Sequence, residues 1–468
     1  MDVMRALLIS TYDLGRQPFG LASPAAWLRR AGVDVRCVDT SREPLVDADA
    51  LAADLIAFYL PMHTATRLTE PLLDRVRVLN PQATLAAYGL YAPLNAEWLR
   101  EHGVAHVIGP EAEEELVTIA TGGPEGPPLH QGYVGADLQV GPRVARLAFI
   151  TPDREGLPAL ANYAALQMPN GSRRIVGSTD ATRGCKHVCR HCPIVPVYGG
   201  TFRVVPVDVV MADIRAQVAA GAQHISFGDP DFFNGPTHAQ RIVERLAREH
   251  PGVTYDVTIK IEHLLMHAPL LPLLRETGCL FVTSAVESVD DEVLARLRKG
   301  HTRADFVRAV ALCRAERIAL SPTFVPFTPW TTLSGYVDLI ATLETLELIE
   351  DVAPIQLAIR LLVTSNSALL ELSELRDAID EFDRASLTYP WRHSDARLDA
   401  LQRDVMQLVG ARAGDERAIV FAEIAALARE RAGIRATPPP RSAGHKAAYM
   451  TEAWYCCAEP GPELVQGM

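Results

Sequence analysis

Residues 182–200 read TRGCKHVCRHCPIVPVYGG and hold three cysteines in a C-x3-C-x2-C pattern. Cys185, Cys189 and Cys192 would share one loop, and clustered thiolates suit a soft transition-metal centre. A closed zinc site takes four protein ligands, and so does an ordinary ferredoxin cluster. Three cysteines would leave one iron of a 4Fe–4S cubane open. A zinc site would need a fourth ligand, for which His187 and His191 are the candidates.

The motif lies within a regular alternation of strand and helix patterns. Between residues 175 and 366 the pattern predicts six β/α repeats. An eight-fold barrel usually takes about 250 residues, so we predict a partial, six-stranded parallel (β/α)6 barrel. Ligands of such sheets bind at the carboxyl ends of the strands, which is where the cysteine motif falls.

The segments outside this barrel have patterns of their own. Residues 1–125 also alternate strands and helices, which predicts a Rossmann-like, doubly wound α/β domain. Residues 126–174 begin rich in Gly and Pro and are interpreted as a linker and lead-in. A helical C-terminal region is predicted over 367–440, followed by a flexible tail over 441–468.

Composition limits the classes of function. The chain has 468 residues and a net charge of −12, which argues against nonspecific binding to nucleic acid or an anionic membrane. It lacks the roughly 18 consecutive apolar residues of a membrane span, and its first residues lack a signal-peptide pattern. We therefore expect a cytoplasmic protein, in which eight cysteines do not form a disulfide framework.

The cysteine motif and its setting resemble the radical SAM superfamily. The resemblance implies a 4Fe–4S cluster held by Cys185, Cys189 and Cys192, with S-adenosylmethionine chelating the open iron. His191 occupies the aromatic position of the motif, near the adenine. An electron donor such as flavodoxin or ferredoxin would reduce the cluster, and a carbon–sulfur bond of S-adenosylmethionine would break homolytically.

Polar landmarks follow at successive strand ends, and the resemblance assigns them to contacts with S-adenosylmethionine. They are Gly228, Asp229 and Pro230 after the second strand, Lys260 and Glu262 after the third, and Glu287 and Ser288 after the fourth. The second group departs from the Gly-Gly-Glu of many members, and the fifth-strand segment lacks the usual glycines. Those departures weaken the assignment at both places.

The N-terminal domain resembles that of cobalamin-dependent radical SAM proteins. Cobalamin domains with a histidine ligand carry D-x-H-x-x-G, whereas the first loop here, TYDLGRQPFGLAS at 11–23, has no histidine. Some relatives bind cobalamin without it. The missing histidine favours a retained scaffold over bound cobalamin, and both remain open.

The chain ends in AWYCCAEPGPELVQGM, residues 453–468. Exposed free thiols are prone to oxidation, so the Cys456–Cys457 pair indicates a function, either redox or capture of a thiophilic element. The motif CCAEP resembles the CUAEP/CCAEP-tail radical SAM proteins, and the layout is similar to radical SAM enzymes of arsinothricin biosynthesis. The resemblance implies transfer of the 3-amino-3-carboxypropyl group of S-adenosylmethionine to trivalent arsenic held by Cys456 and Cys457.

Two other functions remain open at this point. One is a cobalamin-dependent radical SAM methyltransferase. The other is a non-catalytic iron–sulfur or metal-binding protein, against which the polar landmarks at four strand ends argue. Aminocarboxypropyl transfer to arsenic is the main expectation, with a small-molecule substrate and no nucleic-acid or membrane partner.

Overall fold

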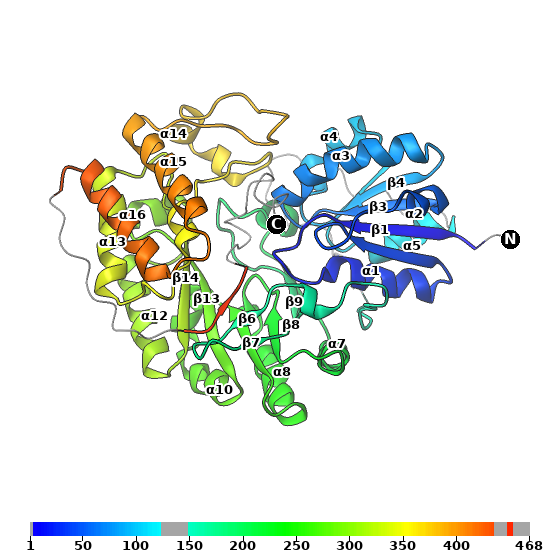
Figure 1. The fold of residues 1–468 in the computed structure, drawn as a ribbon, viewed down its shortest axis with the longest axis horizontal. Helices are drawn as coiled ribbons and strands as arrows, with labels where there is room; N and C mark the ends of the chain where they lie inside the picture. Colours follow the sequence, from blue (N-terminus) through cyan, green and yellow to red (C-terminus); the bar gives the residue numbers. More distant parts are fainter. Residues whose placement is uncertain (1–2, 123–147, 435–446, 453–468) are drawn as a thin grey trace.

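The structure, a computed structural model, describes residues 3–122, 148–434 and 447–452 (Figure 1). In Figure 1 the blue N-terminal domain lies on one side, and the green and yellow barrel domain on the other. The orange C-terminal helices lie against the barrel. This mixed α/β architecture with two parallel sheets confirms the predicted fold class.

The N-terminal domain is a five-stranded parallel sheet in the order β2-β1-β3-β4-β5. Alternating residues of β1 point to opposite faces of the sheet. Leu7 and Ile9 pack in the core under α3 and α4, and Ala6 and Leu8 pack in the core under α1 and α5. This is the doubly wound order in which ligands bind at the carboxyl edge. The elements are β1 Arg5–Ser10, α1 Phe19–Arg30, β2 Asp34–Asp39, α2 Asp47–Ala52, β3 Leu55–Tyr59, α3 His63–Leu79, β4 Thr84–Tyr88, α4 Ala96–Glu101, β5 His106–Ile108 and α5 Glu113–Thr121.

The barrel domain is a second parallel sheet in the order β14-β13-β12-β11-β8. Helices between successive strands pack on one side and share a single large core with them. The elements are β8 Val176–Thr179, α7 Val207–Ala219, β11 His224–Phe227, α8 Pro236–Glu249, β12 Thr254–Thr258, α9 Ile261–Met266, α10 Leu271–Glu276, β13 Cys279–Glu287, α11 Asp291–Arg296, α12 Arg303–Ala315, β14 Ala319–Phe324 and α13 Leu333–Thr345.

Two of the predicted strands differ in detail. The segment predicted as the sixth strand, 355–363, forms only an isolated parallel bridge between Phe327 and Arg360. Arg360 also pairs with Asp399 at 2.7 Å and lies over the ring of Trp391, so the C-terminal region holds this segment as well. The first predicted strand is split, and its second half becomes β9 Thr182–Gly184, antiparallel to β10 Phe202–Val204.

The C-terminal region is only partly helical. Helices α14 Ser373–Arg376, α15 Ala396–Ala411 and α16 Arg417–Arg431 fall within the predicted 367–440, whereas 377–395 is irregular with isolated bridges. Leu401 of α15 and Ile424 of α16 are buried in the barrel core, so the region is part of the barrel domain's fold.

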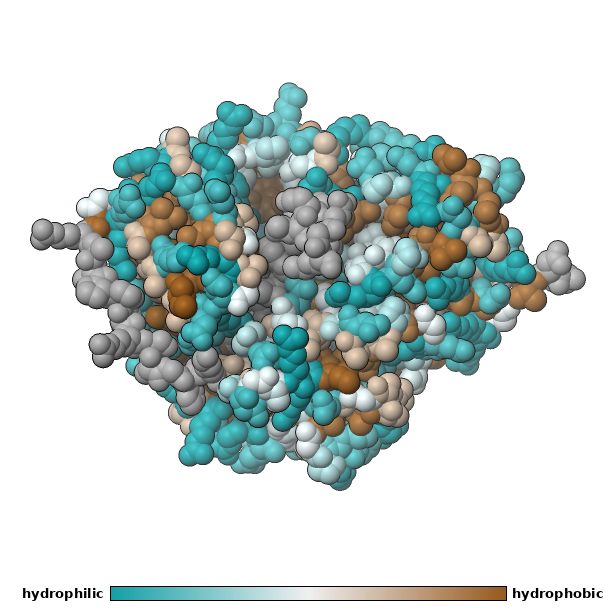
Figure 2. Space-filling view, viewed as in Figure 1, coloured by the Kyte–Doolittle hydropathy of each residue, from teal (hydrophilic) through white to brown (hydrophobic). Residues whose placement is uncertain are grey.

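The surface is mostly hydrophilic. The face in Figure 2 is largely teal, with apolar residues in small scattered groups, as expected for a chain of net charge −12. Among the residues that the structure describes, no helix combines the length and apolar character needed to cross a membrane.

Candidate functional site

The cysteine loop begins at Gly184, the last residue of β9, and returns along β10. Gly184 has a φ of +79°, and a Cβ there would lie 2.4 Å from the ring of Tyr198 and 2.7 Å from the carbonyl oxygen of Thr201. Only glycine satisfies both conditions. The backbone therefore turns sharply at the position directly before the first cysteine.

None of the three cysteines of this loop forms a disulfide in the structure. Cys189 is buried, and Cys185 and Cys192 are half-buried. Burial raises the pKa of the Cys185 thiol to about 11, so its thiolate needs a compensating cation such as iron. The thiol also lies 3.8 Å from Oδ1 of Asn234, in the loop after β11. The second strand end thus contacts the cysteine loop directly.

The geometry argues against a single zinc ion on this loop. Within the described ranges, the only His, Cys, Asp or Glu trio with all ligand atoms within 4.8 Å of one another is His187, Asp231 and His263. The two histidines considered as fourth ligands face carboxylates: His187 contacts Asp231, and His191 contacts Glu287. The spacing of the cysteines fits separate irons of one cluster better than one ion.

The Gly228-Asp229-Pro230 segment lies at the carboxyl end of β11, as predicted, and its acid faces inward. Asp229 accepts hydrogen bonds from the Ala181 amide at 2.9 Å and from the Thr182 hydroxyl at 2.5 Å. Burial, reinforced by Asp180, raises the pKa of Asp229 to about 7. In this structure Asp229 ties β11 to the β8–β9 junction that carries the cysteine loop.

Gly228 marks a close approach between two strand ends. A Cβ there would lie 2.3 Å from Oδ1 of Asp180. Because no other side chain fits this space, Gly228 allows the ends of β8 and β11 to come together beneath the cysteine loop.

The third strand end carries a charged pair. The ammonium of Lys260 lies 3.1 Å from Oε2 of Glu262 and donates to Nδ1 of His187 at 3.2 Å. Lys260 is buried, whereas Glu262 is partly exposed. The sequence predicted that Lys260 and Glu262 follow the same strand. It gave no sign of the contact between Lys260 and His187 of the cysteine loop.

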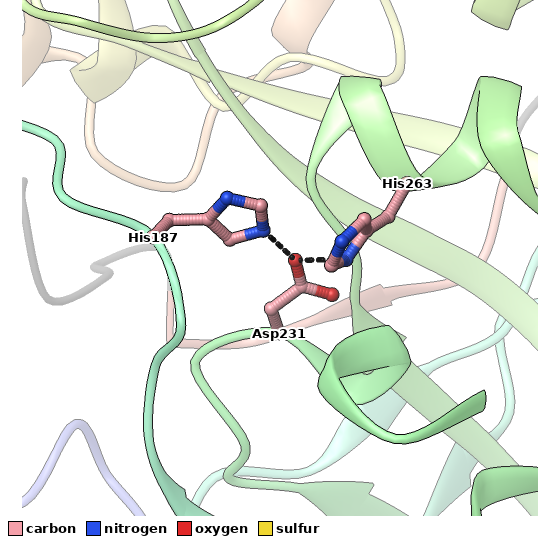
Figure 3. A group of neighbouring side chains, drawn as sticks. All are labelled: His187, Asp231 and His263. Carbon is pink, nitrogen blue, oxygen red and sulfur yellow. Dashed lines mark hydrogen bonds and ion pairs between the residues drawn. The ribbon is translucent and has the colours of Figure 1, made fainter. Parts of the chain in front are cut away.

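Next to this pair, three side chains converge (Figure 3). His187 Nε2 lies 3.2 Å from Oδ2 of Asp231, and His263 Nδ1 lies 2.7 Å from the same oxygen. Burial acts to raise the pKa of Asp231, but its contacts with His187 and His263 hold that pKa below the ordinary value. Sequence reasoning missed Asp231. Its one signal in the sequence was an acid directly after the expected Gly-Asp-Pro.

The fourth strand end holds a buried charge network. Glu287 Oε1 lies 3.0 Å from Nε2 of His191 and 3.3 Å from Nζ of Lys299. Burial acts to raise the pKa of Glu287, but the Lys299 ammonium and the His191 hydrogen bond hold it at about 2. The network joins His191, at the aromatic position of the cysteine motif, to Glu287, one of the residues predicted to contact S-adenosylmethionine.

Backbone strain accompanies this network. Glu287 has a φ of +69°, and the β13–β14 register shifts between Ala285 and Glu287. A non-glycine residue in this region costs about 1–3 kcal/mol and is usually held by its surroundings at functional positions. The neighbouring Ser288 accepts a hydrogen bond from the Asp290 amide at 3.1 Å and starts the turn into α11. Lys299 was missed because it follows a helix, where an exposed lysine is the ordinary expectation.

Buried ion pairs fix the N-terminal domain to this site. Arg183 of β9 lies 2.7 Å from Glu113 at the start of α5. Arg154 of the lead-in pairs with Asp213 of α7 at 2.9 Å and donates to Gln17 at 2.8 Å. Gln17 belongs to the loop after β1, so the carboxyl edge of the first sheet lies against the barrel domain.

Two acids meet at this domain junction. Burial raises the pKa of Asp13, in the loop after β1, to about 7, and Asp180 after β8 adds to the effect. Burial also raises the pKa of Asp180 itself. Each acid follows the first strand of its sheet, so the two ligand-binding edges face each other here.

The C-terminal strand approaches the same junction. β15 Tyr449–Met450 pairs with β6 Leu166–Gln167, and the Thr451 amide donates to the Ala165 carbonyl at 2.9 Å. Glu452 comes so close to Gly15 that a Cβ on that glycine would lie 2.9 Å from its Oε2. The predicted tail residues Cys456 and Cys457 lie outside the described residues.

Comparison with known proteins supports this architecture. Residues 180–329 match the family described as the Radical SAM superfamily. The chain is 25% identical over 338 residues to the hopanoid C-3 methylase of Methylococcus capsulatus, covering 69% of this chain and 64% of that protein. It is 27% identical over 149 residues to the bacteriochlorophyllide d C-12(1)-methyltransferase of Chlorobaculum tepidum, covering 31% of this chain and 32% of that protein. It thus spans less than two thirds of either relative.

Solved structures show the same fold. The radical enzyme OxsB with aqua-cobalamin bound aligns over 88% of this chain and 68% of its own, with a TM-score of 0.66 and 16% identity. The methyltransferase TsrM from Kitasatospora setae, with cobalamin and a [4Fe-4S] cluster bound, aligns over 74% of each chain with a TM-score of 0.58 and 17% identity. Both the cysteine loop and the strand ends described above fall within the matched region, so residues 180–329 of this chain form a radical SAM domain.

Proposed function

We propose that this protein is a cobalamin-dependent radical SAM methyltransferase. The observation that carries the proposal is the Rossmann-like domain, whose ligand edge is held against the cysteine loop by Arg183, Glu113 and Arg154. Both curated relatives named above transfer methyl groups. This places methyl transfer ahead of aminocarboxypropyl transfer to arsenic, which was the main expectation from the sequence.

In this proposal, the cysteine loop holds the cluster. Cys185, Cys189 and Cys192 supply three thiolates. The sharp turn at Gly184 sets the position of Cys185, the first of the three. A bound cluster with S-adenosylmethionine supplies one-electron chemistry and the methyl donor. The chain contributes the ligands, their spacing and a largely buried environment.

Charged residues at the strand ends orient the methyl donor. Glu287 stays ionised at neutral pH because its pKa is about 2. Its Oε2 is buried and has no hydrogen-bond partner among the described residues, so it can accept from a sugar hydroxyl. Lys260, whose ammonium is buried beside Glu262, can pair with the donor's carboxylate.

The N-terminal domain fits cobalamin in fold and placement, but it lacks the histidine motif. Loop residues 11–18, at the carboxyl end of β1, contain no histidine. A bound cobalamin would therefore receive no histidine ligand from this loop. Asp13 and Gln17 are polar residues of this loop that would be placed to contact it, and cobalamin when bound supplies a methyl carrier.

A second candidate is 3-amino-3-carboxypropyl transfer to trivalent arsenic. The observation that favours it is the Cys456–Cys457 pair, which lies four residues past Glu452. An extended chain spans about 3.5 Å per residue, so Cys456 lies within about 14 Å of Glu452. Glu452 itself lies at the domain junction, next to Gly15, so the thiols are tethered near the proposed site.

One experiment separates the two candidates. Reduced, cluster-loaded protein is incubated with S-adenosylmethionine and cobalamin, with and without arsenite, and the products are identified by mass spectrometry. Methyl transfer predicts S-adenosylhomocysteine that depends on cobalamin. Methylthioadenosine with an aminocarboxypropyl arsenical would instead establish the second candidate and refute the first. A Cys185→Ala control should give neither set of products.

A further inference from the structure

We propose that His187, Asp231 and His263 form a second metal site, separate from the cysteines, for a divalent first-row transition-metal ion. Two imidazole nitrogens and one carboxylate oxygen are a donor set used for such ions, with coordination positions left open. Their ligand atoms lie within 4.8 Å of one another. Figure 3 shows both rings pointing at the same carboxylate oxygen.

The contact between His263 and Asp231 is the strongest observation. Nδ1 of His263 lies 2.7 Å from Oδ2 of Asp231, the shortest of the contacts within the trio. Both side chains are 1% exposed, so water does not satisfy them. A proton on Nδ1 can hold the two atoms at this distance, and a divalent ion ligated by both would replace that proton.

The three ligands come from three separate elements. His187 lies on the cysteine loop, Asp231 on the loop after β11, and His263 on α9. The ring centroids of the two histidines are 4.5 Å apart. Oδ1 of Asp231 accepts from the Phe233 amide at 3.0 Å, which leaves Oδ2 directed at the two rings. A bound ion would therefore connect the cysteine loop, the loop after β11 and helix α9.

The neighbouring charges set the conditions for binding. Without an ion, Lys260 donates to Nδ1 of His187, so the proton of that ring sits on Nε2 and faces Asp231. Binding at Nε2 would move this proton to Nδ1. Oε2 of Glu262, 3.7 Å from Nδ1, is the acceptor that would orient the ring. Lys260 keeps its contact with Glu262 at 3.1 Å.

The open coordination positions give the site a ligand class. With three protein ligands, the ion could take a small oxygen donor such as a carboxylate. His187 lies between two of the cysteines, so such a ligand would be held next to the cysteine loop. The site uses none of the thiols, and its existence does not depend on which group the enzyme transfers.

Manganese binding tests this proposal directly. Mn²⁺ prefers imidazole and carboxylate ligands to thiolates, so it distinguishes this site from the cysteines. Untagged, cluster-loaded protein is titrated with Mn²⁺, and free ion is counted by its electron paramagnetic resonance signal. We expect one more bound Mn²⁺ per chain in the wild type than in Asp231→Asn. Glu262→Gln should weaken that site by about 10- to 100-fold.

A local control separates ligation from general packing. His267→Ala changes a ring whose centroid is 5.5 Å from that of His263 but which is outside the proposed ligand set, and it should keep the extra Mn²⁺. His187→Gln provides a second ligand variant in case Asp231→Asn fails to fold, judged by circular dichroism. Equal Mn²⁺ binding by wild type and both ligand variants would overturn the proposal, as would loss of the ion in His267→Ala.

Discussion

At the residue scale, the site depends on charges that burial would neutralise if they stood alone. Glu287 remains ionised because Lys299 and His191 lie within 3.3 Å of its Oε1. Asp229 has no such cation beside it, and its pKa rises to about 7. Asp229 follows β11 and Glu287 ends β13 of the same sheet. Their different environments nevertheless give the two acids different protonation near neutral pH.

Acid should destabilise both domains through buried histidines. Burial lowers the pKa of His63 and of His301 from 6.5 to about 4. Because the pKa of each histidine is depressed in the folded state, its contribution to the free energy of unfolding is fully present above pH 6.5. That contribution is lost as the pH falls toward 4. Each contributes about 3 kcal/mol. Thermal unfolding followed across this pH range should show a falling midpoint, and His301→Gln should reduce the slope. An unchanged slope in that variant would contradict the assignment.

The turn before the first cysteine should tolerate no side chain. Gly184→Ala adds a Cβ 2.4 Å from the ring of Tyr198 at a φ of +79°, so the loop must shift. We expect a severalfold loss of bound iron and sulfide after reconstitution. Gly252→Ala is the matched control, because its φ is +98° and nothing lies within 4 Å. That variant should lose only about 1–2 kcal/mol of stability and keep its cluster. Equal cluster loading in the two variants would refute this role for Gly184.

At the element scale, the local sequence pattern predicted most strands and helices. It did not predict the contacts with residues far along the chain that change some of them. Apolar runs such as 5–10 and 280–287 form strands whose residues are mostly buried. The run 355–363 has a similar pattern, yet Arg360 is drawn to Asp399 and Trp391. Those partners lie over 30 residues further on and leave no local signal.

The same limit explains the candidate site. Spacing predicted which residues follow each strand, so the cysteine loop and Glu287 were found. The trio of His187, Asp231 and His263 comes from two loops and helix α9, and no pattern in the sequence links them. Only the pairing of β11 with β8 and β12, the strands that lead into the three segments, brings them together.

The contact between β9 and α5 should be a main source of domain coupling. Arg183 and Glu113 are 8% and 3% exposed, so Arg183→Met leaves a buried carboxylate unpaired. We expect a loss of about 3–5 kcal/mol. Arg203→Met removes the nearby pair with Glu111, which is 21% and 18% exposed, and should cost about 1 kcal/mol. Urea unfolding of the two variants would compare them, and equal losses would contradict this ranking.

At the whole-molecule scale, two parallel sheets present their carboxyl edges to one junction. The loop after β1 reaches Ser178 of β8 through the carbonyl of Gln17, and the C-terminal strand β15 leads toward the same place. The missing histidine in residues 11–23 argued against cobalamin. Two structural neighbours were solved with cobalamin bound, and cobalamin at this junction of the present chain is part of the proposed function.

The central claim is that the N-terminal domain holds cobalamin beside the radical SAM domain, and cobalamin stoichiometry tests it most directly. The full chain is reconstituted anaerobically with its cluster, incubated with hydroxocobalamin and desalted. Cobalt and the cobalamin absorption spectrum are then measured per chain. The account predicts about one cobalamin per chain, reduced at least tenfold when Asp13 and Gln17 are both changed to Leu. A cluster-loaded chain that retains no cobalamin would contradict the account.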